Sequence, residues 1–185
     1  MLSRIITKIF SIIDTLRWNS YYKTCEKRGM KLGTNVALSH GINFGSEPYL
    51  IEIGDFSRVS NSVSFINHSG GQLLMRTYED YKDVRIFGRI KIGEKCFIGA
   101  KSTISYGVEI GNRSIIGTGS VVTESIPADS VYAGVPAKFI CTTKDYYERK
   151  KLENIQYPRE LEAERSKLDQ FLIKNLPHTY KPIKK

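Results

Sequence analysis

One feature constrains the fold of this chain more than any other: an aliphatic residue recurs at every sixth position through its second half. Counted from Ile86, each sixth residue is isoleucine or valine as far as Val122. The members of this ladder are Ile86, Ile92, Ile98, Ile104, Ile110, Ile116 and Val122. Two earlier runs keep the same spacing in other phases, and they consist of Ile53, Val59 and Phe65, and of Leu32, Leu38, Phe44 and Leu50.

A period of six excludes an α-helix and fits a β-strand. Six residues turn the face of an α-helix by roughly 240°, whereas side chains alternate across a strand, so every sixth residue stays on one face. The residue at the fourth offset shares that face and is mostly small or aliphatic. Glycine directly follows several rungs and permits the bends that short strands need. The pattern predicts a solenoid with an aliphatic interior.

Several of these units resemble a known family signature. Residues 92–97 (IGEKCF), 98–103 (IGAKST) and 110–115 (IGNRSI) resemble the repeat of the hexapeptide acyltransferases, and residues 134–138 (GVPAK) resemble the element that closes their repeats. The resemblance implies an all-β fold, a left-handed parallel β-helix with three hexads per coil, against the usual right-handed crossover rule. It also implies a homotrimer with active sites between subunits, and acetyl-CoA as co-substrate.

The segments on either side of the repeats have helical patterns. We expect an amphipathic helical segment at 1–30, the β-helix at 31–141 with a loop at 70–85, and a helical segment with a basic tail at 142–185. Apolar residues at helical spacing in the first segment are Leu2, Ile5, Ile6, Ile9, Ile12, Ile13 and Leu16. We interpret this helix as a cap over the open end of the coil, with peripheral contact to the inner membrane as the alternative.

The break in the ladder indicates the catalytic residue. Phe65 and Ile86 are 21 residues apart, which is not a multiple of six, so the intervening segment is predicted to leave the coil as a loop. His68 precedes this loop, where the sugar and xenobiotic branches of the family carry a general base. An imidazole, with an ordinary pKa of about 6.5, can accept a hydroxyl proton at neutral pH and return it. The resemblance therefore implies catalysis by His68, with Asn67 orienting it or the acceptor, and requires no metal.

The resemblance also implies where the other substrates bind. The pantetheine arm of the coenzyme would lie along small-residue corners, and its phosphates would need a cation. The matching cofactor-binding residues are Ala100, Thr118, Gly119 and Lys138, with Phe97 where the family often has tryptophan. Tyr78 and Tyr81 on the loop are predicted to stack on a sugar acceptor.

Composition narrows the remaining classes of function. A net charge of +9 favours an anionic partner, but no interleaving of aromatic and basic residues supports nucleic-acid binding. Three cysteines without paired spacing favour a reducing compartment, and neither a signal peptide nor a membrane span is expected, so we predict a cytoplasmic protein that is either free or peripheral at the inner membrane.

The resemblance implies an acetyl-CoA-dependent O-acetyltransferase that acts on a sugar hydroxyl in bacterial surface polysaccharide synthesis, and three alternatives stay open at this stage. One is acetylation of an amino sugar or of a xenobiotic or antibiotic instead of a sugar hydroxyl in surface polysaccharide synthesis. The second is a non-catalytic hexapeptide scaffold. The third is a zinc enzyme of the same architecture, which would need three histidines, and the chain has only His40, His68 and His178.

Overall fold

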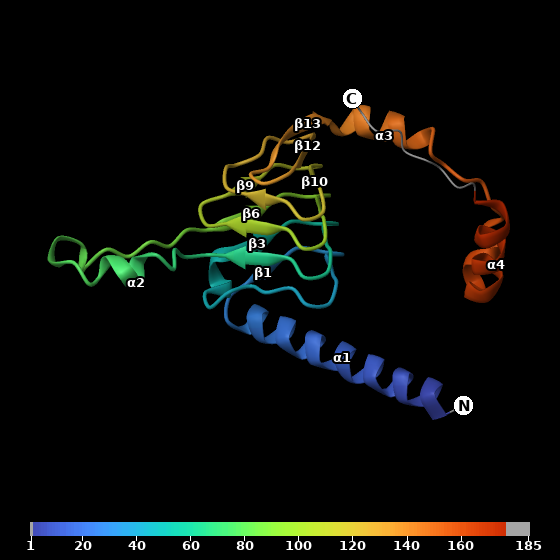
Figure 1. The fold of residues 1–185 in the computed structure, drawn as a ribbon, viewed down its shortest axis with the longest axis horizontal. Helices are drawn as coiled ribbons and strands as arrows, with labels where there is room; N and C mark the ends of the chain where they lie inside the picture. Colours follow the sequence, from blue (N-terminus) through green and yellow to red (C-terminus); the bar gives the residue numbers. More distant parts are fainter. Residues whose placement is uncertain (1, 177–185) are drawn as a thin grey trace. The chain divides into compact units, whose positions relative to one another are not determined.

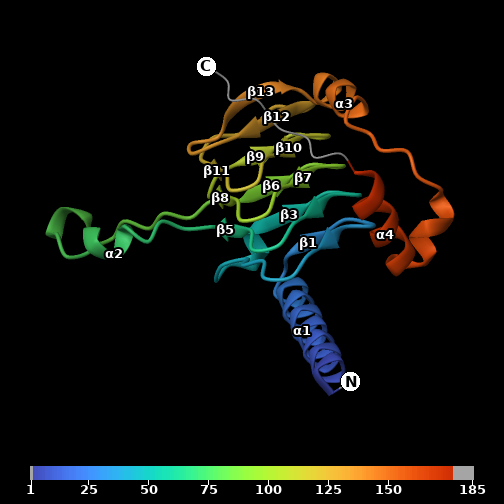
Figure 2. The ribbon, with the colours of Figure 1, turned by 45° about the vertical axis from the view of Figure 1, so that its right-hand side comes forward.

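Most of the chain winds as a three-sided coil of short parallel strands. A computed structural model describes the backbone of residues 2–176 and the side chains of residues 6–176. The strands form three sheets, one along each side of the coil, here named A, B and C (Figures 1 and 2). Sheet A contains β1 (Lys31–Leu32), β3 (Ile51–Ile53), β6 (Ile90–Ile92) and β9 (Glu109–Ile110). Sheet B contains β2 (Ala37–Leu38), β4 (Arg58–Val59), β7 (Phe97–Ile98), β10 (Ile115–Ile116), β12 (Ser130–Ala133) and β13 (Lys138–Thr142), and sheet C contains β5 (Ser64–Ile66), β8 (Thr103–Ser105) and β11 (Val121–Val122).

The register between strands gives the length of each coil. Asn43 pairs with Ser64, so the first coil has 21 residues; Ser64 pairs with Thr103, so the second has 39. Thr103 pairs with Val121, which gives 18 residues, or three hexads, for the third coil. Among the described strands only β13 is antiparallel to its neighbour, β12. The solenoid predicted from the ladder and the parallel β-helix implied by the resemblance are therefore confirmed.

The ladder forms the interior of the coil. Six of its rungs are no more than 1% exposed, namely Ile92, Ile98, Ile104, Ile110, Ile116 and Val122. The inclusion of Ile86 was wrong: this residue is partly exposed, and its N–H donates to the side chain of Gln72 within the loop. The coil resumes only at β6, because the returning stem of the loop occupies the residues before it.

Fully buried serines share the interior with the aliphatic rungs. They are Ser57, Ser102, Ser114 and Ser120, each 0% exposed. The hydroxyl of Ser57 donates to the carbonyl of Gly93 in the next coil at 2.7 Å and accepts the N–H of Cys96 at 2.9 Å. Burying a hydroxyl costs free energy unless its hydrogen bonds are made. Both hydrogen bonds of Ser57 are made, so this serine links two coils without leaving a polar group unsatisfied.

The N-terminal helix α1 (Leu2–Lys27) caps the coil only with its C-terminal third. Tyr22 and Cys25 are 7% and 2% exposed and belong to the core, with Trp18 and Tyr21 packed against it. The ring of Tyr21 stacks on Phe44, with the centroids 6.3 Å apart. The first half of α1 runs past the edge of the coil (Figures 1 and 2), so the predicted cap is correct for only part of the helix.

The remaining elements lie in the loop and in the C-terminal segment. The loop carries α2 (Gln72–Met75) and the 3-10 helix η2 (Glu79–Tyr81), and another 3-10 helix, η1 (Pro48–Leu50), precedes β3. After β13 come α3 (Thr143–Lys151), η3 (Arg159–Ala163) and α4 (Arg165–Asn175). Residues from 147 onward form a separate compact unit, and no side chain described in it is fully buried.

Candidate active site

His68 lies at the corner between sheets C and A, where the loop leaves the coil. It comes shortly after β5 and forms an antiparallel bridge with Phe87 on the returning stem. The N–H of Ser69 donates to the carbonyl of Ile86 at 3.0 Å, which ties the two stems together. The imidazole and the ring of Phe87 have centroids 5.8 Å apart. The structure thus places His68 at the root of the loop, and its catalytic role stays a prediction.

A carboxylate that the sequence analysis missed holds this imidazole. Nδ1 of His68 lies 2.9 Å from Oε2 of Glu47, which precedes η1. A carboxylate accepts only, so Nδ1 carries a proton, and in the neutral imidazole the lone pair is then on Nε2. The loop acids Glu79, Asp80 and Asp83 make no described contact with the imidazole. The pair is the arrangement that a general base requires.

The environment of Glu47 keeps its carboxyl ionised. Partial burial acts to raise the pKa of Glu47. Hydrogen bonds from Ser46 and His68, together with the charges of His68 and Arg28, outweigh this effect, so the pKa of Glu47 lies below its ordinary value. The side chain of Glu47 is 16% exposed and that of His68 is 35% exposed. The imidazole is therefore anchored on its inner nitrogen and accessible from outside.

Asn67, predicted beside His68, is buried and faces inward. It is 1% exposed, and its amide donates to the carbonyls of Phe44 at 3.1 Å and Glu47 at 3.0 Å. A Cβ on Gly45 would lie only 2.2 Å from its Oδ1, so a glycine is required there. These contacts fix the corner that presents Glu47. A direct part of Asn67 in catalysis stays a prediction.

The residues predicted to bind the coenzyme gather elsewhere. Ala100 and Thr118 lie on the corner between sheets B and C, one coil apart, and the N–H of Gly119 donates to the carbonyl of Ala100 at 2.8 Å. Gly119 has φ +71° and open space where a Cβ would be, so a ligand can approach its backbone closely. Phe97, in β7, is 43% exposed, and Lys138, in β13, is also exposed. Binding of the coenzyme by these residues stays a prediction.

One chain does not bring the two predicted halves of the site together. The N–H of Lys101 donates to the carbonyl of Asn61, so Ala100 lies at the same end of sheet C as the residues before β5, whereas His68 lies at the other end. Seven residues of strand and corner separate the two ends, which is at most about 23 Å of extended chain at 3.3 Å per residue. Within one chain the imidazole of His68 and the corner with Ala100 and Gly119 therefore lie at opposite ends of this side of the coil.

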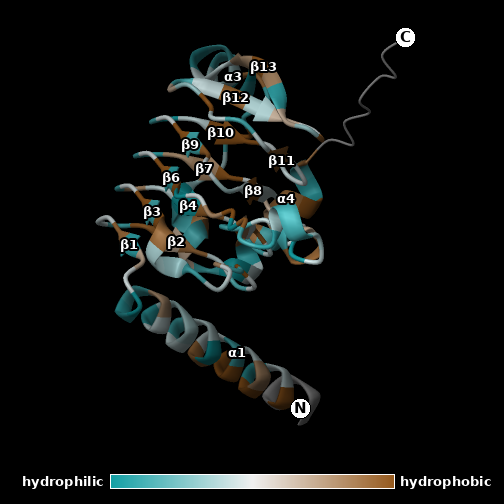
Figure 3. Cartoon of the chain, turned by 90° about the vertical axis from the view of Figure 1, so that its left-hand side faces the viewer, coloured by the Kyte–Doolittle hydropathy of each residue, from teal (hydrophilic) through white to brown (hydrophobic). Residues whose placement is uncertain are grey.

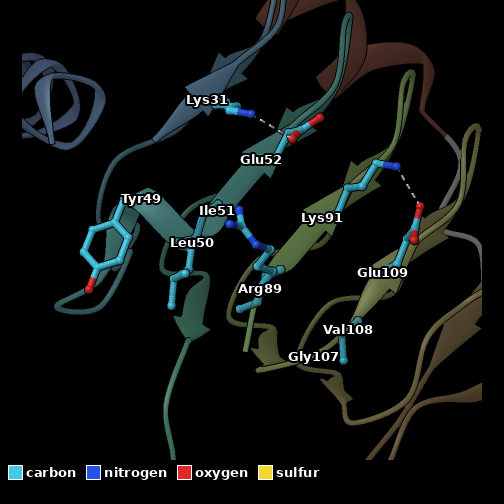
Figure 4. A pocket seen from close by; sticks show the side chains of 11 residues that line it. Lys31, Tyr49, Leu50, Ile51, Glu52, Arg89, Lys91, Gly107, Val108 and Glu109 are labelled. Atoms are coloured by element: carbon cyan, nitrogen blue, oxygen red, sulfur yellow. Dashed lines mark ion pairs between the residues drawn. The ribbon is translucent and has the colours of Figure 1, made fainter. Parts of the chain in front are cut away.

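A groove of about 470 Å³ lies on the outer face of sheet A (Figure 4), and neither His68 nor Glu47 is among the residues that line it. Tyr49, 52% exposed, lies at its edge, two residues after Glu47. Arg89 comes two residues after Phe87, and its side chain points across the sheet toward Ile51 (Figure 4). Its guanidinium makes no ion pair among residues 6–176. The groove therefore combines an exposed aromatic ring with a cation that has no ionic partner in the described chain.

The predicted acceptor residues Tyr78 and Tyr81 lie far out on the loop. They are 59% and 51% exposed and belong to the segment around η2. Neither lines the groove. Contact with an acceptor stays a prediction for both.

The part of the chain that the structure describes contains no cluster of metal-binding side chains. Residues 6–176 contain no group of three or more His, Cys, Asp and Glu side chains that could hold a metal ion. His40 lies on an exposed corner away from His68. His178, the third histidine of the zinc alternative, lies outside the described residues.

Comparison with known proteins agrees with the repeat and the coil. Residues 89–124 match the hexapeptide repeat of succinyl-transferase. Protein CapG of Staphylococcus aureus is 42% identical over 125 residues, which are 68% of this chain and 71% of CapG. Galactoside O-acetyltransferase of Escherichia coli (strain K12) is 36% identical, over 54% of this chain and 47% of that enzyme. The crystal structure of a maltose O-acetyltransferase from Clostridium difficile 630 shares the fold, with a TM-score of 0.54 and 20% identity over 68% of this chain and 75% of that one.

The repeat, the three-sided coil and these likenesses define one class, the hexapeptide-repeat transferases. The match to CapG extends over most of both chains. The chain belongs to the hexapeptide-repeat family of acyltransferases.

Proposed function

We propose that the protein transfers an acetyl group from acetyl-CoA to a hydroxyl of a sugar acceptor. The observation that carries the proposal is the pairing of His68 with Glu47 at the root of the loop, which holds the imidazole on Nδ1 and leaves its side chain 35% exposed. The 36% identity to a galactoside O-acetyltransferase supports the acceptor class. We place the reaction in surface polysaccharide synthesis on the cytoplasmic side of the membrane.

The proposed mechanism needs one proton carrier. Nε2 of His68 takes the proton of the acceptor hydroxyl as its oxygen attacks the thioester carbonyl. The imidazolium that forms is stabilised by the Glu47 carboxylate. When the carbon–sulfur bond breaks, His68 gives the proton to the departing thiolate. The products are the acetyl ester and free coenzyme A, and no covalent enzyme intermediate is formed.

The separation of the two corners supports a homotrimer. A neighbouring subunit that presents its Ala100–Gly119 corner to His68 would complete the site, as the family resemblance implies. Lys138 would then meet a phosphate of the coenzyme. The shared fold with the maltose enzyme supports the left-handed sense of the coil.

The groove on sheet A is the proposed acceptor site on the side of His68. Tyr49 offers a ring on which a sugar can stack, and Arg89 offers donors for hydroxyl or carboxylate oxygens. Tyr78 and Tyr81 would approach the acceptor from the loop. The same geometry would also serve N-acetylation of an amino sugar or acetylation of a xenobiotic, and the acceptor screen below separates these cases.

The test is an acceptor screen that follows release of free coenzyme A, with wild type, His68→Ala and His40→Ala side by side. His68→Ala should lower turnover by at least about 100-fold, the usual contribution of a general base, while the exposed control His40→Ala should retain wild-type turnover. Equal rates for wild type and His68→Ala would retire the mechanism. Absence of turnover with every sugar, amino sugar and xenobiotic acceptor would favour the non-catalytic scaffold.

A further inference from the structure

The first half of α1 presents an uncovered apolar stripe. Its side chains are between 44% and 64% exposed, and they are Ile6, Ile9, Phe10, Ile12, Ile13 and Leu16. In Figure 3 the hydrophobic colour of α1 is concentrated toward the N-terminal end of the helix. A contiguous stripe of this kind on a helix marks an interaction surface.

The stripe and the capping residues face opposite ways. At about 100° per residue, the centre of the stripe near Ile9 and Ile13 is roughly 170° from the side that carries Tyr22 and Cys25. The side of the first half that continues the capping face instead carries Ser11 and Thr15, and the hydroxyl of Thr15 donates to the carbonyl of Ser11. The stripe therefore faces away from the end of the coil and cannot extend the cap.

The charges of α1 select the partner. Five of its residues are cationic and two are acidic, so the helix has a net charge of +3; the cations are Arg4, Lys8, Arg17, Lys23 and Lys27, and the acids are Asp14 and Glu26. Arg17 and Lys23 lie roughly 60° on either side of the stripe's centre, Arg17 directly after Leu16 and Lys23 two turns further along the helix. A second copy packed on the stripe would bring like charges together. An anionic surface with an apolar interior would satisfy both the stripe and its flanks.

We infer that α1 docks the protein on an anionic lipid bilayer, with the helix lying in the plane of the interface. Helices with an apolar face and basic flanks bind at this depth, and their affinity rises with the proportion of anionic lipid. None of the described helices has the length and apolar character needed to cross a membrane. The inference does not depend on acetyl transfer, because neither the stripe nor its flanking cations contribute to the candidate active site.

The experiment uses the full chain and vesicles of phosphatidylcholine, with or without phosphatidylglycerol, in a flotation assay. One double variant, Ile9→Asp with Ile13→Asp, places two charges in the stripe. The matched control, Ser11→Asp with Thr15→Asp, places the same two charges on the other side of the same helical turns. Circular dichroism checks the fold of each variant, and sedimentation velocity without lipid gives its oligomeric state.

Wild type should bind anionic vesicles at least about tenfold more tightly than neutral ones, and added salt should weaken this binding. The stripe variant should lose at least about tenfold in affinity, and the control should stay within about threefold of wild type. Absence of wild-type binding to anionic vesicles would overturn the inference, as would equal binding by the two double variants. A larger wild-type assembly that dissociates only in the stripe variant, without vesicle binding, would assign the stripe to a second copy instead. If the stripe variant fails to fold, the wild-type lipid and salt dependence decides alone.

Discussion

Replacing Glu47 by glutamine is the most direct test of the pair at the loop root. The change keeps the size of the side chain but removes the charge that accepts the Nδ1 proton of His68 at 2.9 Å. A hydrogen bond to a charged group contributes about 1.5–3 kcal/mol. Since the His68 side chain is 35% exposed, solvent screening favours the lower end of that range. A loss of about 1.5–2 kcal/mol in the transition state corresponds to a decrease in kcat of roughly 10- to 30-fold.

Steady-state release of coenzyme A measures this decrease, with Glu94→Gln as a control that removes one exposed glutamate from a different corner. A second readout separates positioning from general damage. Nitrogen-15 spectra of the histidines should show a single Nδ1–H tautomer for His68 in wild type and a mixture in Glu47→Gln. A kcat within twofold of wild type, with an unchanged tautomer, would refute the assignment of Glu47.

Three further predictions follow from buried and paired groups. Ser57→Ala should lower the free energy of unfolding in urea by about 1–3 kcal/mol at matched protein concentration, because the N–H of Cys96 loses its buried acceptor; no change would contradict the cross-link. The pKa of Glu47 is lowered in the folded state, so the ionised carboxylate stabilises the protein above its ordinary pKa of about 4.3, and this stabilisation is lost as the pH falls further. The difference in free energy of unfolding in urea between wild type and Glu47→Gln should therefore narrow from pH 7 to pH 3. A constant difference would contradict this. Arg89→Gln should raise KM for the acceptor by about tenfold and leave KM for acetyl-CoA unchanged, and an equal rise in both would reject the groove as the acceptor site.

Periodicity predicts the coil well because the interior imposes the same demand on every turn. Rungs such as Ile98 and Ile104 are surrounded by other rungs, so their aliphatic character is independent of distant details. The prediction that Ile86 belongs to the interior was wrong, because a single residue in phase with the ladder can belong to a loop stem. The spacing gave no information on where the stem ends, since this depends on the pairing of His68 with Phe87.

Glu47 was missed although the sequence contained a signal for it. The first two ladders are offset by 21 residues, as in Leu32 and Ile53, and Glu47 precedes His68 by the same number. Aligning residues by coil would have placed the two side chains one above the other. The groove could not be found in this way, because its shape depends on the conformation of η1 and on the direction that Arg89 takes.

Helix α1 shows a different limit. Its apolar spacing predicted an amphipathic helix. Spacing alone does not show that the first half and the C-terminal third of this helix carry their apolar residues on different sides. Tyr22 and Cys25 cover the end of the coil, while Ile9 and Ile13 belong to another side. Only the position of the helix against Phe44 distinguishes the two.

The two stems of the loop are zipped at the corner, with Gly88 donating to the carbonyl of Asn67 at 3.0 Å, and the strands before and after it keep their register despite a 39-residue coil. Whatever lies between the stems can therefore lengthen, shorten or be exchanged without disturbing the prism. Exchange of this segment alone would therefore change what surrounds a proposed acceptor, because the His68–Glu47 pair and the corner with Ala100 and Gly119 lie outside it.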